Sequence, residues 1–396
     1  LNYDSNEEDP SDSSAKGLRK VTDSKPYEDA FQRTEISDDD DIIICSQYLP
    51  LAPFKSENGE YEFKLTDEPI YRTLYKIIEG KTNIKWFGSL KNENILDNDK
   101  DKILELLKQK NLYVLEIDKE IYKKVLVLVQ EILEPLFHYA QVKSAIMEDF
   151  KVLDKHWKAY QDYNDCVCKT ISNYLTTKSL IYLNDIEFFL VPSILYSINK
   201  HKNDILQNLS IGIFIHSPFP SFDVFKRIPI RDEVIKSLLK CRIIGFHTFE
   251  FSRNFLKSSR RLLHANYVST RNGQLAVNYL DSTALIRVKN VSPDIDLLKE
   301  DLNSQEYKDQ YQEIIKKHEN KKQIFVSLDH IAYLLSMKNK LDGYRKFLSE
   351  LGEKASKNVF ILYIRYGDGN TLDNLDKNQS ALIETIEKLV KEIKAA

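Results

Sequence analysis

Apolar residues follow two alternating patterns along this 396-residue chain. Short continuous runs, such as IIIC at 42–45 and IGIFI at 211–215, are bounded by polar or turn-forming residues and predict buried β-strands. Between such runs, segments 119–139 and 148–175 carry apolar residues at helical spacing. Strands that alternate with helices predict an α/β fold with a largely parallel sheet.

The composition divides the chain into an acidic start and two regions with the α/β pattern. Residues 1–40 are Ser-rich, acidic and poor in periodic apolar positions, so we expect them to be disordered. Residues 41–297 are predicted to form an N-terminal Rossmann-like domain, and the charged segment 298–322 a linker helix. Residues 323–396 carry only a β-α-β-α series, the start of a C-terminal Rossmann-like domain. Two strands do not complete a doubly wound sheet, so we expect this second domain to be incomplete.

Charge is spread unevenly over the sequence. Residues 1–41 contain 13 Asp and Glu against 5 Lys and Arg, a net charge of −8, whereas the whole chain carries −3. The remainder is only mildly basic, which does not favour a nucleic-acid partner. No apolar run is long enough to span a membrane, and the first residues lack the pattern of a signal peptide. We therefore expect a cytoplasmic protein without a membrane partner.

The cysteines and glycines do not predict a metal or nucleotide motif. The four cysteines are Cys45, Cys166, Cys168 and Cys241. The spacing of Cys166 and Cys168 is too short for a C-x2-C metal hairpin, and no histidine lies at ligand spacing, so we expect reduced thiols and no metal. Neither a P-loop nor G-x-G-x-x-G occurs, and GDGN at 367–370 is expected to be a surface turn.

Two polar residues directly follow predicted strands of the first domain. His216 ends SIGIFIH, and Asp185 follows SLIYLN. Open parallel sheets bind ligands beyond the C-terminal ends of their strands, so we expect both residues at the functional edge of the sheet. Asp185 would there either cap the next helix or contact a ligand. Pro218 and Pro220 would stiffen the loop after His216.

Several segments together resemble a known family. HSPFPS, then IPIRDEVI with Arg231, then IIGFHTFEFSRNFL occur in the order and spacing of the trehalose-6-phosphate synthase family of retaining glucosyltransferases. IIICSQYLPL, KWFGSL, EPLFHY, HWKAYQDYN and NDIEFFLVP resemble further motifs of the same family. The resemblance covers about residues 41–365 and is greatest to the eukaryotic branch, in which a synthase-like domain is fused to a phosphatase-like one.

This resemblance implies a GT-B fold, with two Rossmann-like domains facing a cleft. The family reaction converts UDP-glucose and glucose 6-phosphate into trehalose 6-phosphate and UDP, without a metal or other cofactor. The first domain would bind the acceptor and the second the UDP-glucose donor. His216 would be the catalytic residue that faces the sugar, and Asp185 and Arg231 would bind substrate. Basic side chains would offset the charge on the leaving diphosphate.

The sequence departs from the family where the chemistry takes place. Tyr48 stands where the family's motif has an arginine that binds phosphate, and Val125 and Glu134 stand where it has a tyrosine and a tryptophan that bind the acceptor. Asn184 and Glu187 replace two histidines that flank the kept aspartate. His330 and Leu335 replace an arginine and a lysine that neutralise the donor diphosphate. Each lost charge-assisted contact weakens binding by about 1.5–3 kcal/mol.

Three functions follow as alternatives. The first is a degenerate synthase domain that does not transfer glucose and instead senses glucose 6-phosphate or trehalose 6-phosphate, or regulates an attached phosphatase. The second is an active glucosyltransferase in which other basic residues, with Arg231, Arg253 and Lys338 as candidates, have taken over the role of the cations lost from the family's motifs. The third is a structural scaffold for a phosphatase domain or another trehalose-pathway subunit, with the acidic segment 1–41 as a partner arm.

Four other positions carry structural expectations. Trp86 and Trp157 are predicted to lie in the core. His247 is predicted to be structural, and Glu187 to lie at the surface or at a helix start. The basic helix face formed by Arg253, Lys257, Arg260 and Arg261 is expected to be solvated.

Overall fold

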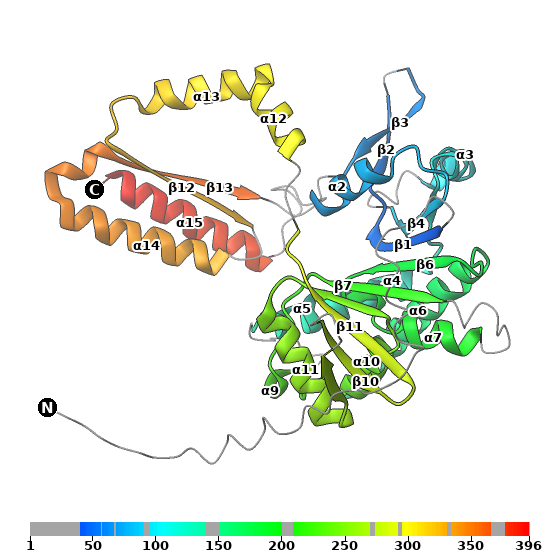
Figure 1. Cartoon of the computed structure of the whole chain (residues 1–396). Helices are drawn as coiled ribbons and strands as arrows, with labels where there is room; N and C mark the ends of the chain where they lie inside the picture. Colours follow the sequence, from blue (N-terminus) through cyan, green and yellow to red (C-terminus); the bar gives the residue numbers. More distant parts are fainter. Residues whose placement is uncertain are drawn as a thin grey trace, which may run out of the picture. The chain divides into compact units, whose positions relative to one another are not determined.

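In the computed structural model the chain forms two units, Leu1–Pro293 and Asp294–Ala396, and each is considered by itself (Figure 1). The structure describes residues 40–56, 58–66, 69–90, 96–139, 150–199, 209–269, 274–291, 295–330, 334–365 and 377–395. The disorder expected for residues 1–39 and the turn expected at 367–370 lie outside this part of the chain.

Unit 1 is built on one large sheet, in the strand order β5-β4-β1-β6-β7-β8-β11-β10-β9. Its strands are β1 (Asp41–Tyr48), β4 (Ile84–Ser89), β5 (Leu112–Val114), β6 (Ser179–Asn184), β7 (Ser210–Ile215), β8 (Ile243–Phe246), β9 (Asn266–Ser269), β10 (Leu275–Tyr279) and β11 (Ser282–Val288). Pairing is parallel from β5 to β11 and antiparallel from β11 through β10 to β9. The predicted α/β fold with a largely parallel sheet is therefore confirmed.

A small hairpin of β2 (Leu51–Lys55) and β3 (Tyr61–Leu65) stands apart from this sheet. Pro53 made the first strand hard to recognise, because proline cannot donate to a ladder in the middle of a sheet. In this two-stranded ladder Pro53 pairs with Phe63 and needs no second neighbour.

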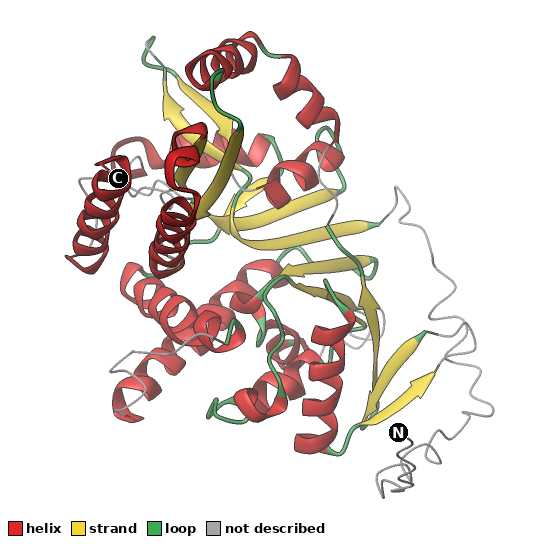
Figure 2. Ribbon diagram, turned by 90° about the vertical axis from the view of Figure 1, so that its left-hand side faces the viewer, coloured by secondary structure: helices red, strands yellow, loops and turns green. Residues whose placement is uncertain are grey.

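Helices flank the sheet of unit 1 (Figure 2). They are α2 (Pro69–Ile78), α3 (Leu96–Gln109), α4 (Lys119–Val127), the π-helix η3 (Leu128–Leu133), α5 (Glu134–Phe137), α6 (Phe150–Ser172), the 3-10 turn η5 (Ile186–Phe188), α7 (Val191–Ile198), α9 (Phe222–Phe225), α10 (Arg231–Leu238) and α11 (Phe249–Leu263).

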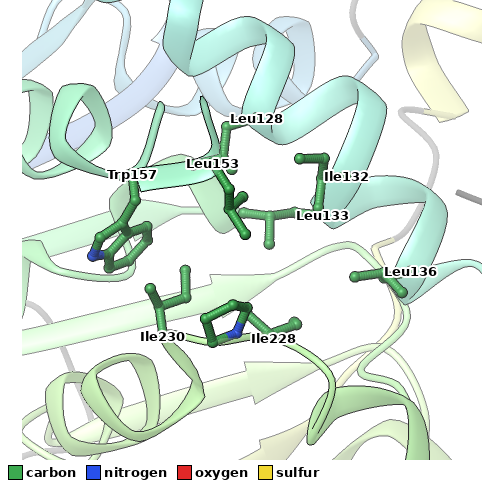
Figure 3. A pocket seen from close by; sticks show the side chains of 9 residues that line it. Leu128, Ile132, Leu133, Leu136, Leu153, Trp157, Ile228 and Ile230 are labelled. Atoms are coloured by element: carbon green, nitrogen blue, oxygen red, sulfur yellow. The ribbon is translucent and has the colours of Figure 1, made fainter. Parts of the chain in front are cut away.

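The predicted single helix over 119–139 is interrupted by the π-helix η3. The backbone N–H of Glu134 bonds to the carbonyl of Val129, five residues back, and Pro135 follows without an N–H of its own. After this wider turn Pro135 lies at the start of the next helix, α5, where its missing N–H does not break the helix. A small pocket of about 20 Å³ lies beside η3, between Leu133, Trp157 and Ile230 (Figure 3). All its lining side chains are apolar, so it offers a water molecule no hydrogen-bond partner.

Alternate residues of β1 supply two separate cores, one on each face of the sheet. Ile43 and Cys45 belong to the larger core, with residues of α4, α6, α7, α10 and α11. Ile42 and Ile44 belong to the smaller core, with residues of α2 and α3. Both predicted core tryptophans are buried, Trp86 at 0% and Trp157 at 7% exposure, so that prediction is confirmed. The four cysteines are unpaired.

Unit 2 contains a parallel pair of strands, β12 (Gln323–His330) and β13 (Asn358–Arg365). The helices of this unit are α12 (Ile295–Asn303), α13 (Gln305–His318), α14 (Leu334–Leu351), the 3-10 segment η7 (Gly352–Lys357) and α15 (Lys377–Ala395). Met337, Leu341, Ile383, Ile386 and Leu389 of α14 and α15 form its core. The predicted β-α-β-α order from residue 323 is present, and the segment expected as one linker helix contains α12 and α13.

Candidate functional site

The polar residues expected at the edge of the sheet meet where β6 and β7 end. Asn184 is paired with Phe214 in the register of these strands, and the N–H of Asp185 donates to the carbonyl of Phe214 at 3.0 Å. The chain therefore leaves both strands at the same level. Asp185 and His216 follow directly, and the N–H of His216 donates to Asp185 Oδ1 at 3.2 Å.

Asp185 occupies a backbone conformation that few residues adopt, with φ 69° and ψ −165°. It stands before η5 but makes no side-chain capping hydrogen bond to that turn. Its carboxylate instead accepts from the N–H groups of His216 and Ser217, and from Ser217 Oγ at 3.4 Å. Of the two predicted roles, the helix cap is therefore not made. Asp185 holds the first turn of the HSPFP loop, and such strained residues cluster at functional sites.

His216 is held through both nitrogens of its ring. Nδ1 lies 3.1 Å from His247 Nε2, and Nε2 lies 3.2 Å from Asn184 Oδ1. Because the amide oxygen only accepts, Nε2 of His216 carries the proton, and His247 donates to Nδ1. Burial, then the neighbouring His247, lowers the pKa of His216 to about 4, and burial lowers the pKa of His247. Both imidazoles are neutral at pH 7.

The contact between the two histidines depends on Gly245. Phe214 pairs with Gly245 in the register of β7 and β8, and a Cβ at residue 245 would lie 2.4 Å from the Phe214 ring. The glycine lets the ring lie over β8. Two residues further along each strand, His216 and His247 then meet with ring centroids 5.2 Å apart. The predicted structural role of His247 therefore takes the form of a hydrogen bond to the candidate catalytic residue.

Asp185, which accepts from the N–H of His216, belongs to a group of three interacting carboxyls with Glu134 and Glu187. Burial raises the pKa of Asp185 to about 7, and Glu134 adds to that rise. Burial and the neighbouring Asp185 raise the pKa of Glu187 well above its usual value, and burial raises the pKa of Glu134. Among the described residues, no ion pair involves any of the three. The site is therefore polar but carries little fixed charge.

The surface placement expected for Glu187 is wrong, because the residue is only 7% exposed. It does lie in the first turn of η5, as the helix-start alternative predicted. Two residues of α6 hold this turn: the Asn164 amide donates to the carbonyl of Glu187 at 3.0 Å, and Tyr160 Oη donates to the carbonyl of Ile186. Tyr160 also accepts from the N–H of Phe189 at 3.1 Å.

Two other positions of the degenerate motifs lie in unit 1. Val125 is 1% exposed and belongs to the large core, so it presents no polar group to a ligand. Tyr48 ends β1, half-buried, and lies beside Tyr122 of α4. Burial and then Tyr48 raise the pKa of the Tyr122 phenol. Neutral phenols therefore stand at this end of β1, where the family motif has an arginine.

The structure does not bring Arg231 into the cluster of Asp185 and His216. Arg231 begins α10, and its Nη1 donates to the carbonyl of Ile228 at 3.2 Å. Its Nε lies 3.9 Å from Asp232. Among the described residues, no hydrogen bond or ion pair joins Arg231 to the other two, and its substrate-binding role stays a prediction.

The candidates of the second domain lie in unit 2. His330 ends β12 and Leu335 lies in the first turn of α14, and both side chains fall outside the described part of the chain. Lys338, the alternative cation, is bonded to Asp342 at 3.0 Å. No group of three or more His, Cys, Asp or Glu that could hold a metal ion occurs within the described ranges. Over the same residues, no helix is long and apolar enough to cross a membrane.

Comparison with known proteins decides the family, since the model of glycosyltransferase family 20 matches residues 40–395. The chain belongs to glycosyltransferase family 20. Among its relatives is the 56 kDa subunit of the UDP-forming α,α-trehalose-phosphate synthase of Saccharomyces cerevisiae, 29% identical over 81% of this chain and 62% of the relative. A probable synthase of Arabidopsis thaliana is 26% identical over 84% of this chain and 38% of the relative. The chain thus spans less than two thirds of these relatives.

Solved structures of the family have the same fold. The N-terminal domain of Candida albicans trehalose-6-phosphate phosphatase matches with a TM-score of 0.70 at 20% identity, over 89% of this chain and 69% of that one. A Burkholderia xenovorans synthase in complex with glucose-6-phosphate matches with a TM-score of 0.63 at 14% identity, over 89% and 70%. The predicted GT-B fold is therefore confirmed.

Two residues of the site were not among the predicted ones. Asn184 was noted only as a lost family histidine, yet its amide oxygen binds His216. Tyr160 lies within HWKAYQDYN, which the resemblance had singled out without giving the tyrosine a role. The adjacency of Asn184 to Asp185 was the available signal for the first, because Asn184 ends β6 and Asp185 directly follows it.

Proposed function

We propose that this chain is a non-transferring member of glycosyltransferase family 20 that regulates trehalose synthesis. The observation that supports this proposal is the low fixed charge of the site in unit 1. Asp185, which accepts from the N–H of His216, interacts with two further carboxyls, Glu134 and Glu187. All three carboxyls have raised pKa values, the histidine pair is neutral, and within the described residues no cation is paired with these carboxyls. Transfer from UDP-glucose to a sugar phosphate needs cations at both phosphate groups.

A sugar phosphate would meet an unfavourable environment at this site. Its dianion would approach three carboxyls whose raised pKa values show that this environment disfavours negative charge. Tyr48 offers only a phenol where the family motif has an arginine. A neutral hydrogen bond stabilises by about 1 kcal/mol, against about 1.5–3 kcal/mol for a charge-assisted one. The site therefore supports weak binding and poor stabilisation of a charged acceptor.

The arrangement of His216 supports the same proposal. An imidazole that contacts a substrate hydroxyl needs a free ring nitrogen, yet both nitrogens of His216 bind protein side chains. Binding a sugar there would require breaking one of these hydrogen bonds, worth about 1 kcal/mol. The catalytic role of His216 in transfer remains the alternative, and turnover would reveal it.

The relatives support a regulatory role beside active enzymes. One relative is named as a subunit of a synthase, and one structural neighbour as the N-terminal domain of a trehalose-6-phosphate phosphatase. We place this chain in the same context, as a cytoplasmic domain that supports an attached or associated phosphatase or synthase subunit. Its ligand, if one is kept, would be glucose 6-phosphate or trehalose 6-phosphate.

Calorimetric titration with glucose 6-phosphate, trehalose 6-phosphate and UDP-glucose tests the site. We expect Tyr48→Arg to tighten glucose 6-phosphate binding about tenfold or more, because it adds one charge-assisted contact. Phe54→Arg, at an exposed position of β2, is the matched control and should leave binding unchanged. Micromolar binding by the native chain that disappears in His216→Ala would favour a sensor, and no heat with any ligand a scaffold.

Turnover is the measurement that can overturn the proposal. The full-length protein is incubated with UDP-glucose and glucose 6-phosphate, and UDP release is followed. We expect no release above the background without protein. Steady release that is abolished in His216→Ala would show an active glucosyltransferase and refute the non-transferring function.

A further inference from the structure

A group of basic residues of unit 1 lies on helix α11 and directly after the neighbouring helix α9; both helices are labelled in Figure 1. Its cations are exposed, and those of α11 follow the i, i+4, i+7, i+8 spacing that keeps side chains on one helix face. We call this set the basic face; it consists of Lys226, Arg227, Arg253, Lys257, Arg260 and Arg261.

The basic face is held in a fixed arrangement. Phe222 lies between Lys226 Nζ at 5.8 Å and the Arg261 guanidinium at 4.8 Å from its ring centroid. Arg260 stands over the ring of Tyr267 at 5.8 Å. These cation–π contacts restrain long side chains without neutralising them. On the inner side of α11, Asn254 donates to the carbonyl of Phe219 at 3.0 Å.

Asp223 balances part of this positive charge, because Lys226 and, more weakly, Arg261 and Arg227 lower its pKa. Lys226 pairs with Asp223 at 2.7 Å. Over the described part of the chain, no ion pair within 4 Å involves Arg253, Lys257, Arg260 or Arg261. Glu250, in the first turn of α11, is the acidic residue of that helix. The basic face therefore presents a concentrated positive charge to any acidic group that can reach it.

The N-terminal segment carries the opposite charge in matching amount. Residues 1–15 contain five acidic residues and no basic one, namely Asp4, Glu7, Glu8, Asp9 and Asp12. We propose that this acidic segment docks on the basic face of its own chain. This inference is independent of the proposed function, because neither partner belongs to the histidine site.

The topology places the two within reach. Because β9 runs parallel to β8, and α11 ends just before β9, the end of α11 lies at the edge of the sheet where the parallel strands begin. β1 begins at the same edge, at Asp41, three strands from β8. Three strand spacings are about 14 Å. The 28 residues from Asp12 to Asp40 can reach at most about 100 Å, which is well beyond this separation.

Carbodiimide cross-linking tests this docking, because the reagent joins carboxylates directly to lysine amines in contact with them. Lys257 is the reporter on the basic face. Lys108 is the matched control: it is exposed near the end of α3, on the side of the sheet with the smaller core. We expect cross-links from residues 1–15 to Lys257 to exceed those to Lys108 about tenfold, because the cations around Lys257 attract the acidic segment, whereas tethering to the same chain is common to both lysines.

Two variants separate docking from unfolding. Neutralising the five acidic residues of segment 1–15 to Asn and Gln changes no described residue of unit 1. It should reduce the Lys257 cross-links to the control yield. Changing Arg253, Arg260 and Arg261 to Gln keeps the reporter lysine, adds no carboxylate beside it, and should do the same, with circular dichroism confirming the fold. Salt of about 1 M, which shortens the Debye length to about 3 Å, should also abolish the excess.

Other outcomes would overturn the proposal. Equal yields at Lys257 and Lys108 would show that the segment does not prefer the basic face. An excess that survives neutralisation of the five acidic residues would show that charge is not its cause. Cross-linked dimers whose yield rises with protein concentration, without an intramolecular product, would assign the basic face to a second copy of the chain.

Discussion

Replacing Asp185 by asparagine is expected to stabilise unit 1 at alkaline pH much more than at acidic pH. Burial raises the pKa of this carboxyl from 3.8 to about 7, against the opposing hydrogen bonds from Ser217 and His216. A carboxyl with a raised pKa binds its proton more tightly in the folded chain. Its contribution to stability is therefore fully present below pH 3.8 and is lost as the pH rises through about 7.

The size of the effect follows from these two pKa values. Between pH 5 and pH 8, the linkage relation gives a loss of about 2.5 kcal/mol in the native chain. Asparagine does not titrate, keeps an oxygen that can accept from the N–H groups of residues 216 and 217, and tolerates the φ of 69°. The stability gained by Asp185→Asn should therefore grow by about 2.5 kcal/mol over this range. The titration of His216 is common to both proteins and cancels to first order.

Urea unfolding followed by tryptophan fluorescence measures this gain. The chain has two tryptophans, Trp86 and Trp157, and both are buried in unit 1. Glu105→Gln, at an exposed position of α3, is the control, and its effect should stay within about 0.5 kcal/mol at every pH. A gain for Asp185→Asn that is the same at pH 5 and pH 8 would refute the raised pKa and the burial behind it.

Three further predictions concern the framework of the site. Tyr160→Phe removes the hydroxyl that holds η5 and should lower the free energy of unfolding by about 1–3 kcal/mol, as measured by urea titration. Gly88→Ala places a Cβ 2.8 Å from the backbone at the end of β1 and should destabilise unit 1 by about 2 kcal/mol or more in thermal unfolding. Gly343→Ala, where a Cβ meets open space inside α14, should instead stabilise unit 2 by up to about 1 kcal/mol in the same measurement. His247→Ala removes the neighbour that lowers the pKa of His216, which should rise toward 6.5 in an NMR titration; an unchanged value would show that burial alone sets it.

The sequence was sufficient for the sheet but not for local departures from regular structure. Runs such as Ile42–Ile44 predict buried strands because fully buried parallel strands lack polar alternation. β2 was missed because a proline argues against a central strand, which pairs with a strand on each side. β2 contains Pro53 and pairs in the structure with β3. The π-helix η3 was missed because helical spacing does not distinguish a turn of five residues from one of four.

The site could be located from the sequence, but its electrostatics could not. Asp185 and His216 were placed together because both follow strands of one parallel sheet. The bond from His216 to His247 requires β7 and β8 to be neighbours, and apolar patterning does not give strand order. The raised pKa of Glu187 depends on how α6 closes over η5 through Asn164, a tertiary contact without a local sequence signal.

The central position of β1 has a consequence for how the protein is made. Asp41 pairs with Ser179, which the ribosome adds 138 residues later. At about 5–20 residues per second, one edge of this isoleucine-rich strand waits about 7–28 seconds for its neighbour. An apolar strand with a free edge invites aggregation with other nascent chains. The four consecutive aspartates at 38–41 directly precede the isoleucine run of this strand and would act as gatekeepers that repel such contacts until β6 emerges.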